Sequence, residues 1–539
     1  MCPNAPLQSY DDVLGAISVR HLNGYFVDVL SGAIYPACVN FYDGKIIRID
    51  QRPTAPDQYI LPGLVDSHTH IESSHLSPYR YAEQAILHGT TSVVTDPSPV
   101  CATTGLIGLE YMVEAGNTTP LKFHYTVPSD IPGLGWKEVR SLLSRDEFVA
   151  LGEITDYEGL IEEKQSIMGK IEVARQLGKP IDGHAPGLRG FHLEQYIMSG
   201  ITSDHESTTS EEALEKHKKG MAIALRESSS NQNLNALLPF ARKNKHMLAT
   251  DHLRSRDLIR GHIDNMLHMA VEGGVDPMQA VRAATLWPSQ HYGLKSGALE
   301  IGTPADMTVV SDLHSFKVLE TWIDGDLVAR NGELLYLGSP PKLVEATFPM
   351  TRLDQIDIHV SGRVAPVKVI CIGSDGEITQ EHEELQVEDG RILADTSRDI
   401  LYMIWVDPAH NWSIHVGFVR GFGLWDGAIA TSEVHKFGGI LCVATTLTNA
   451  QDLINEIIVA GGGSAAILGR DLVLLPLPIA GLMSDLPAKE VAAREFDLMS
   501  MTRNMGCLMN DPFLILSSLG TYLPSTFWAE RTEMSVGAR

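Results

Sequence analysis

The sequence predicts an α/β fold, with a (β/α)8 TIM-like barrel inserted in a small split β domain and a C-terminal α/β domain behind it. Three observations lead to this prediction. Residues 61–289 alternate short apolar strands with longer amphipathic segments, which is the pattern of parallel strands joined by helices. Residues 17–59 alternate apolar and polar positions between turn signals, and a second β stretch follows at 307–330; these lie in the segments 1–60 and 290–340 that flank the barrel. Residues 350–539 begin with a β-rich texture and continue as mixed α/β.

Length and composition bound the class of protein. A chain of 539 residues, 44% of them hydrophobic, is expected to hold more than one domain and to bury sizeable cores. The formal net charge of −25 argues against nucleic acid or an anionic membrane as a partner, because neither would be attracted. We therefore expect a small-molecule partner, and the composition leaves a homodimer open.

Three features of the sequence bear on the cellular location of the protein. The six cysteines are scattered without a CxxC pair, and the N-terminus lacks the basic and then apolar pattern of a signal peptide. No window reaches about 18 uninterrupted apolar residues. We therefore expect a cytoplasmic protein that does not span a membrane.

The two outer β stretches are predicted to form one composite β domain. Turn signals at 30–32 and 42–45 divide the first stretch, and Ile323-Asp-Gly-Asp326 marks a turn in the second. The first stretch is too thin to stand alone, and residues 290–340 look like its missing half. Residues 61–289 would then form a barrel inserted between the halves.

The barrel region contains eight strand candidates. They lie at 61–66, 91–95, 121–127, 148–153, 181–184, 201–205, 221–227 and 246–251. Most gaps between them have helix length, and 79–88 and 210–218 are clear helices. Two helical segments, 257–271 and 277–286, follow the last strand. Eight such units are compact for a barrel but sufficient to close one.

The strand ends carry the residue types of a metal site. They are His68 and His70, Asp96, Glu153, His184, His205 and Glu206, Arg226 and Glu227, and Asp251 and His252. Each alone could equally be a polar residue facing a loop, but in a barrel these ends share the face where active sites are built. His68 and His70 are two apart in a strand, so both imidazoles point to one side. Converging neutral imidazoles favour a divalent transition metal.

The third region, residues 350–539, is predicted as a separate C-terminal domain after a linker at 339–342. Strand texture is clear around 367–372 and 385–392. Gly461-Gly-Gly463 is interpreted as a tight turn rather than a phosphate loop, because no Gly-Lys-Ser/Thr follows it.

Motifs spread over residues 20 to 515 resemble those of one enzyme family. They include Pro62-Gly-Leu-Val-Asp-Ser-His-Thr-His-Ile-Glu-Ser-Ser74, His88-Gly-Thr-Thr-Ser-Val-Val-Thr-Asp-Pro97, Asp182-Gly-His-Ala-Pro-Gly-Leu188, Ser203-Asp-His-Glu206, Gly417-Phe-Val-Arg-Gly-Phe-Gly-Leu424 and Leu477-Pro-Ile-Ala-Gly-Leu-Met-Ser-Asp485. Through them the chain resembles the adenine deaminase family of the amidohydrolase superfamily, metal-dependent hydrolases. The resemblance implies hydrolysis of adenine to hypoxanthine and ammonia.

The resemblance also implies a centre of two divalent transition metal ions, Mn²⁺, Fe²⁺ or Zn²⁺. His68, His70 and Asp251 would hold one ion. His184 and His205 would hold the other. Glu153 would bridge the two, since a carboxylate has two oxygens. Asp251 and Glu153 would be the catalytic residues, and Asp251 would also move a proton from the attacking water to the leaving amine.

Four further residues are candidates for substrate binding. Glu72 and Glu206 lie next to ligands and could contact ring nitrogens of the substrate, or they could support the histidines. Arg226 could bind substrate or pair with a neighbouring carboxylate. His252 follows the proposed ligand Asp251.

Three departures from the family pattern keep the substrate open. The chain has Asp96-Pro97-Ser98 where the family has Asp-Pro-His, and Asp251-His252 where it has Asp-Asp. It has His435-Lys-Phe-Gly-Gly439 in place of His-Asp-x-His-Asn. Besides the deaminase, two hypotheses therefore stand: a metal-dependent hydrolase of another amide, cyclic amide or lactone, and a weakly active or non-catalytic paralogue.

Overall fold

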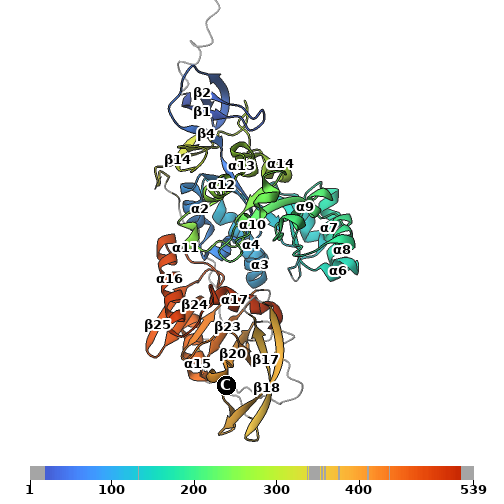
Figure 1. Ribbon diagram of the computed structural model, residues 1–539, viewed down its shortest axis with the longest axis vertical. Coiled ribbons are helices and arrows are strands. Elements are labelled where there is room, and N and C mark those ends of the chain that lie inside the picture. Colours follow the sequence, from blue (N-terminus) through green and yellow to red (C-terminus); the bar gives the residue numbers. More distant parts are fainter. Residues whose placement is uncertain are drawn as a thin grey trace, which may run out of the picture.

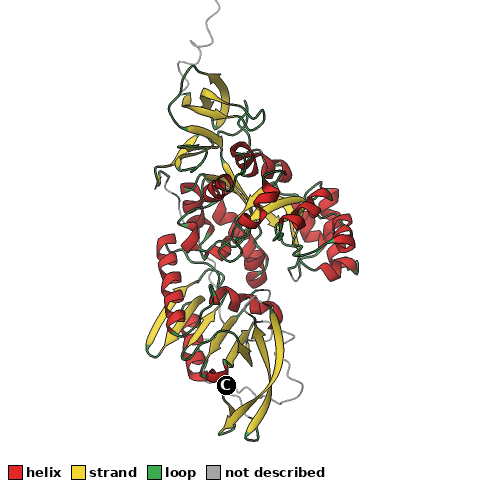
Figure 2. Ribbon diagram, viewed as in Figure 1, coloured by secondary structure: helices red, strands yellow, loops and turns green. Residues whose placement is uncertain are grey.

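The computed structural model (Figure 1) describes residues 19–523 except 132, 337, 339–351, 354–355, 357–359, 374–376, 409–411 and 436–437. The predicted linker at 339–342 and Lys436 lie outside these described residues. Along its longest axis the molecule passes from one β sheet, through a helix-rich central body, to a second sheet with helices (Figure 2). No helix within the described ranges is long and apolar enough to cross a membrane.

The first sheet contains eight strands from both sides of the barrel segment, in the order β16-β15-β14-β13-β4-β1-β2-β3. The strands are β1 (Arg20–Val27), β2 (Ile34–Tyr42), β3 (Lys45–Gln51), β4 (Tyr59–Pro62), β13 (Met307–Val310), β14 (Val318–Ile323), β15 (Asp326–Arg330) and β16 (Glu333–Leu334). Strand β4 joins the halves, because it pairs parallel with β1 and antiparallel with β13. The turn between β2 and β3 uses Asp43 and Gly44 at φ 49° and 74°, which suits the twist of a two-residue hairpin.

The central body contains the eight predicted barrel strands, all paired in parallel. They are β5 (Leu64–Thr69), β6 (Thr90–Thr95), β7 (Lys122–Val127), β8 (Phe148–Ile154), β9 (Ile181–Gly183), β10 (Ser203–Asp204), β11 (Ala222–Arg226) and β12 (Met247–Ala249). Strands β5 to β9 form one ladder and β10 to β12 another. The short β10 explains the break between them, and the Thr202 amide still donates to the Ile181 carbonyl at 2.8 Å across it.

Hydrogen bonds between the first and last strands close the barrel. The Ser67 hydroxyl donates to the Leu248 carbonyl at 2.7 Å. The Asp251 amide donates to His68 O at 3.0 Å, and the His70 amide donates to Asp251 O at 2.9 Å. The predicted barrel fold is thereby confirmed, and its closing seam runs through residues predicted as metal ligands.

Helices surround this barrel. They are η1 (Ile71–Ser74), α2 (Pro78–Leu87), α3 (Ser98–Thr104), α4 (Leu106–Gly116), α5 (Trp136–Leu143), α6 (Tyr157–Ile161), α7 (Gln165–Gln176), α8 (Gly190–Met198), α9 (Ser210–Lys218), α10 (Leu234–Ala241), α11 (Ser255–Leu258), α12 (Ile263–Glu272), α13 (Pro277–Ala283) and α14 (Leu286–Tyr292). The prediction of one helical segment over 257–271 is wrong, because α11 and α12 are separate. His262 lies at the break, and its buried ring is held by Thr90 Oγ1 at 2.7 Å and Tyr81 Oη at 2.9 Å.

The C-terminal region is built on a nine-stranded sheet in the order β19-β18-β17-β21-β20-β23-β22-β24-β25. Its elements are β17 (Val364–Ile372), β18 (Ile378–Glu388), β19 (Arg391–Ile392), η2 (Thr396–Arg398), β20 (Leu401–Asp407), β21 (Ser413–Arg420), β22 (Ala428–Thr431), β23 (Ile440–Ala444), α15 (Leu447–Val459), β24 (Gly463–Leu468), β25 (Asp471–Pro476), α16 (Ala488–Asn504), α17 (Pro512–Ser518) and η3 (Leu519–Tyr522). The glycines at 461 and 462 form the turn before β24, both with positive φ. The predicted mixed α/β texture is therefore confirmed.

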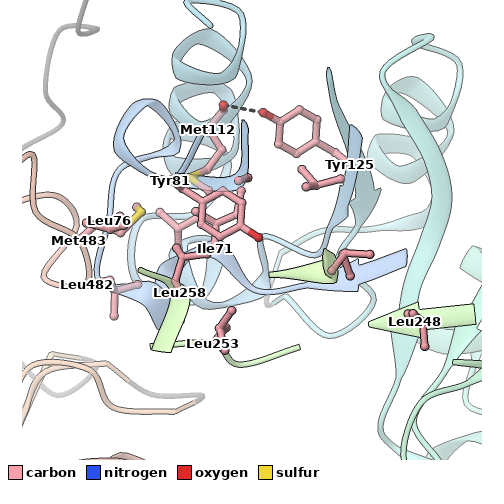
Figure 3. Packing of buried hydrophobic residues seen from close by; sticks show 14 of the residues in the cluster. Ile71, Leu76, Tyr81, Met112, Tyr125, Leu248, Leu253, Leu258, Leu482 and Met483 are labelled. Carbon is pink, nitrogen blue, oxygen red and sulfur yellow. Dashed lines mark hydrogen bonds between the residues drawn. The ribbon is translucent and has the colours of Figure 1, made fainter. Parts of the chain in front are cut away.

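The barrel core continues into the C-terminal region. Figure 3 shows Leu482 and Met483 beside Leu76 on the barrel side. All three side chains are at most 2% exposed. The backbone is paired at the same place, since Ser77 N donates to Ser484 O at 3.0 Å and Ser484 N donates to His75 O at 2.8 Å. The two regions therefore share one apolar core rather than a thin surface contact.

A buried lysine ties together two loops at the carboxyl ends of the barrel strands. Lys216 on α9 is 0% exposed, and its ammonium contacts Asp204 at 2.8 Å, Glu212 at 2.7 Å and Ala185 O at 2.6 Å. Glu212 in turn accepts amide hydrogens from Gly187 and Thr208. These contacts fix the segments that follow β9 and β10.

Removing this ammonium should destabilise the fold strongly. Lys216→Met leaves two buried carboxylates without their cation, so we expect the free energy of unfolding to fall by about 3–5 kcal/mol. Urea denaturation followed by circular dichroism measures the change. Lys219→Met is the control, since its partner Glu194 is 55% exposed, and its loss should cost under about 1 kcal/mol. Equal effects of the two substitutions would contradict the prediction.

Candidate metal centre

The six predicted metal ligands lie together at the carboxyl end of the barrel. Three groups of side chains have ligand atoms within 4.8 Å of one another: His68, His70 and Asp251; His68, Glu153 and His205; and His184, His205 and Glu206. The first group is the set expected for one ion. The other two overlap at His205 and bring Glu206 close to the second set. Such a group of imidazoles and carboxylates suits a divalent transition metal.

Glu153 occupies the middle of the cluster and divides its two oxygens between the two expected sets. Its Oε1 lies 3.2 Å from His70 Nε2. Its Oε2 lies 2.8 Å from His184 Nδ1 and 3.6 Å from His205 Nε2. Glu153 comes from the end of β8, while His70, His184 and His205 directly follow β5, β9 and β10. A carboxylate in this position can contact two cations at once.

The imidazoles are oriented as ligands need to be. His70 Nδ1 lies 2.8 Å from the Asp96 carbonyl oxygen, so this nitrogen carries the hydrogen and donates it, which leaves the Nε2 lone pair for a metal. The Nε2 atom of His68 is buried and has no hydrogen-bond partner among the described residues. A buried ring nitrogen that has no hydrogen-bond partner and lies next to Asp251 is suited to bind a cation.

Burial and the neighbouring charges shift the pKa values of the histidines in the cluster. Burial favours the neutral form of His70, but Glu153, Asp251 and Asp96 outweigh it and raise its pKa to about 10. For His184, burial is likewise outweighed by carboxylates, Glu153 foremost, and its pKa rises to about 9. Burial and the neighbouring His68 hold the pKa of His205 well below its ordinary value. Without a metal, protons therefore supply the positive charge at His70 and His184.

Asp251 is held in a strained backbone conformation against an arginine. Its φ is 55°, a region that non-glycine residues rarely occupy and that often marks functional sites. Its Oδ2 accepts a hydrogen bond from Arg226 Nη1 at 2.9 Å. Burial opposes the ionised form, but His252, Arg226 and the nearby imidazoles keep the pKa of Asp251 well below its ordinary value. The carboxylate is therefore ionised and ready to bind a cation or accept a proton.

Two of the predicted substrate-binding residues are paired with each other. Arg226 Nη1 contacts Glu206 Oε1, and Nη2 donates to Glu206 Oε2 at 3.0 Å. This bidentate geometry is the strong form of an arginine–carboxylate pair. Of the two roles that the sequence allows for Arg226, the structure therefore shows the pairing with a neighbouring carboxylate.

Glu72, in contrast, keeps one oxygen without a partner. The residue is 2% exposed, and its Oε1 accepts the Val100 amide hydrogen at 3.2 Å. Its Oε2 is buried without a hydrogen-bond partner among the described residues. Burial raises the pKa of Glu72 to about 7. The side chain can therefore hold a proton near neutral pH and donate it to an acceptor.

Of the residues that depart from the family pattern, Ser98 and His252 lie within the described ranges, and both lie around the ligands rather than among them. The His252 ring stacks on His70, with centroids 4.6 Å apart and planes 15° apart, and its Nδ1 lies 2.6 Å from Ser73 Oγ. Ser98 begins α3, and its amide donates to Asp96 Oδ1 at 2.9 Å. The His435 ring centre lies 6.1 Å from that of His252. The C-terminal region therefore reaches the metal centre.

Sequence reasoning gave no role to several residues around this centre. Ser73 lies in a matching motif but was assigned no function. Arg254 and Glu433 were not singled out, although both are buried and form an ion pair with Arg254 Nη2 2.9 Å from Glu433 Oε2. The signal in the sequence is weak: the position of Arg254 three residues after Asp251, and of Glu433 two residues before His435.

Comparisons with known proteins give family matches over both the barrel and the C-terminal region. Residues 59–328 match the amidohydrolase family, and residues 377–525 match the adenine deaminase C-terminal domain. An adenine deaminase of Methanosphaera stadtmanae is 37% identical over 92% of this chain and 94% of that protein. One of Methanothermobacter thermautotrophicus is 38% identical over 92% and 94%. Among solved structures, the crystal structure of D-hydantoinase covers 60% of this chain and 97% of its own, with 14% identity and a TM-score of 0.46.

Metal affinity at this centre is expected to rise with pH. His70 and His184 hold protons below their raised pKa values of about 10 and about 9, and a protonated imidazole cannot bind a metal. Between pH 6 and 8.5 each proton that a metal displaces should add about tenfold in affinity per pH unit. Calorimetric titration with Zn²⁺ in buffers of different ionisation enthalpy measures both the affinity and the protons released.

A matched variant separates this effect from general changes in the protein. His314→Gln replaces a histidine of the loop before β14 and should leave the pH dependence unchanged. Affinity that is constant from pH 6 to 8.5 without proton release would contradict the assignment of protons to His70 and His184.

Proposed function

Because this chain belongs to the adenine deaminase family of the amidohydrolases, we propose that it hydrolyses adenine with water to hypoxanthine and ammonia. The observation that carries the proposal is the position of Glu153, whose two oxygens face imidazoles of both expected ligand sets. The chain matches its relatives over nearly their whole length. A small purine base also fits the net charge of −25, which disfavours polyanionic partners.

The donor set fits divalent metal binding, and we propose two ions, each Mn²⁺, Fe²⁺ or Zn²⁺. His68, His70 and Asp251 would hold one, and His184 and His205 the other, with Glu153 between them. When bound, such ions lower the pKa of a coordinated water towards neutrality. The cytoplasmic location and the homodimer stay predictions from the sequence.

In this proposal Asp251 carries the proton. Its ionised carboxylate accepts the proton that the attacking water loses as the water oxygen bonds to C6 of adenine, and the C6=N1 double bond opens with its electron pair moving to N1. The same carboxyl group then gives that proton to the exocyclic amine. The electron pair on N1 re-forms the C6=N1 double bond as the bond from C6 to the amine breaks, and ammonia leaves. The remaining 6-hydroxypurine is hypoxanthine. Arg226 keeps Asp251 ionised between turnovers through the contact at 2.9 Å.

Glu72 and His252 are the proposed contacts to the base. Glu72 can donate a proton from its unpartnered Oε2 to a ring nitrogen, because its pKa is about 7. The His252 ring, stacked on His70, offers a flat surface and a ring nitrogen beside the ligands. For Glu206 and Arg226 the bidentate pair favours a supporting role, in which they hold Asp251 in place.

The alternative substrates rested on the departures at Ser98, His252 and Lys436. Ser98 and His252 lie beside the ligands and replace none of the six proposed ones. Relatives at 37–38% identity are adenine deaminases, which makes adenine the substrate to test first. Cyclic amides and lactones serve as the competing substrates in that test.

The reaction should depend on Asp251 and on metal. Asp251→Asn cannot accept the proton and has lost a ligand charge, so we expect ammonia release from adenine to fall by about 10²–10⁴-fold or more. The matched control is Asp276→Asn, the same exchange at the cap of α13, where asparagine caps equally well. Ammonia release is measured after chelation and reloading with Mn²⁺, Fe²⁺ or Zn²⁺. Wild-type, metal-loaded protein that releases no ammonia from adenine would overturn the proposal.

A further inference from the structure

The contact between barrel and C-terminal region contains a buried ionic network. In this network Arg254, His75 and Arg256 of the barrel each face an acid of the C-terminal region. Arg254 Nη2 lies 2.9 Å from Glu433 Oε2, His75 Nδ1 lies 2.8 Å from Glu495 Oε1, and Arg256 Nη2 lies 2.7 Å from Asp511 Oδ2. Arg254 is 2% exposed and Glu433 is 5% exposed. Desolvating these charges is costly, and the adjoining apolar core already joins the two regions. Holding the regions together therefore does not by itself explain why the network is present.

Arg254 extends this network towards the metal centre. Besides Glu433, its guanidinium donates from Nη1 to the Ser73 carbonyl at 3.0 Å. The Ser73 hydroxyl lies 2.6 Å from His252 Nδ1. Each of these residues is in contact with the next, so Glu433 is joined to His252 through two intermediate residues.

His252 connects this series of contacts with the proposed metal ligands. Its ring stacks on His70, and its Nε2 lies 3.6 Å from Asp251 Oδ1. The bond from Ser73 to Nδ1 fixes the rotation of the ring and so decides which way Nε2 points. The segment that carries Glu433 also brings His435 to 6.1 Å from the same ring.

We propose that Glu433 of the C-terminal region is a positioning residue for the active site, which acts through Arg254 and Ser73 to set the orientation of the His252 imidazole. The inference rests on the proposed function, because His252 is taken to face the substrate. It makes the C-terminal region part of the site's specificity, and it assigns the ionic network to the alignment of a side chain rather than to joining the two regions.

The interface also contains a second serine, which serves as a control for Ser73 because it has the same side chain and lies nearby. Ser77 lies four residues after Ser73, and its hydroxyl donates to Asp485 Oδ1 of the C-terminal region at 2.9 Å. Its hydrogen bonds do not involve Arg254 or His252. Ser77→Ala therefore removes an interdomain hydrogen bond and the side-chain cap that accepts from Arg80 N at the start of α2. It leaves the contacts that orient His252 in place, so it reports what a structural loss alone does.

The experiment compares Ser73→Ala, Glu433→Gln and Ser77→Ala in the full-length protein. We expect the first two to lower kcat/KM for adenine by roughly 10- to 100-fold, because a small misplacement in a site can cost this much. Ser77→Ala should stay near the wild-type value. In a His252→Ala background, Glu433→Gln should have no further effect on kcat/KM, since the residue it positions is gone.

A second readout does not depend on activity. In Zn²⁺-loaded protein labelled with ¹⁵N-histidine, the ring signals of His252 are those missing from His252→Ala. These signals should shift in Ser73→Ala and in Glu433→Gln but not in Ser77→Ala. If wild-type protein fails to deaminate adenine, the proposed function fails, while the ring signals still test the positioning of His252 by themselves.

Arg254→Lys keeps the test decisive if Glu433→Gln does not fold. Lysine retains a cation for Glu433 but cannot also reach Ser73 O with a second rigid donor, so the His252 signals should again shift. Two results would overturn the proposal. One is unchanged His252 signals in folded Glu433→Gln or Arg254→Lys. The other is an equal loss of kcat/KM from Glu433→Gln with and without His252.

Discussion

Backbone hydrogen bonds between the end of β5 and the segment after β12 hold the metal centre of this protein together. The Asp251 amide donates to His68 O, and the His70 amide donates to Asp251 O. The same three residues form one of the candidate ligand groups. Closure of the barrel and assembly of that group are therefore one event, because neither can form while the first and last strands are apart.

The charges of the centre are balanced by its own side chains. Glu153 and Asp251 are ionised, and in the absence of metal His70 and His184 carry protons beside them. Arg226 adds a permanent cation that contacts both Asp251 and Glu206. A metal ion entering this cluster replaces protons rather than introducing uncompensated charge, which keeps the cost of burying the cation low.

The C-terminal region is packed onto the two segments that carry the ligands of the closing seam. Leu482 and Met483 extend the apolar core beside Leu76 (Figure 3). Glu433 lies against Arg254, which contacts the backbone of Ser73 between the ligand-bearing strand and α2. The region therefore shapes the surroundings of His252 while contributing none of the six proposed ligands.

The sequence by itself determined the fold class, the eight barrel strands and the set of residues that converge at the centre. It could do so because strand periodicity is local, and because the carboxyl ends of parallel strands meet at one face whatever the details of packing. The sequence pattern does not predict the break between α11 and α12. At this break His262 forms hydrogen bonds with Thr90 and Tyr81, which are far away in the chain. The pairing of Arg226 with Glu206, and the contacts that lead from Glu433 to His252, were decided only by the tertiary structure. They join residues 20 and about 180 positions apart through side-chain rotamers and burial, which no local pattern of residues specifies.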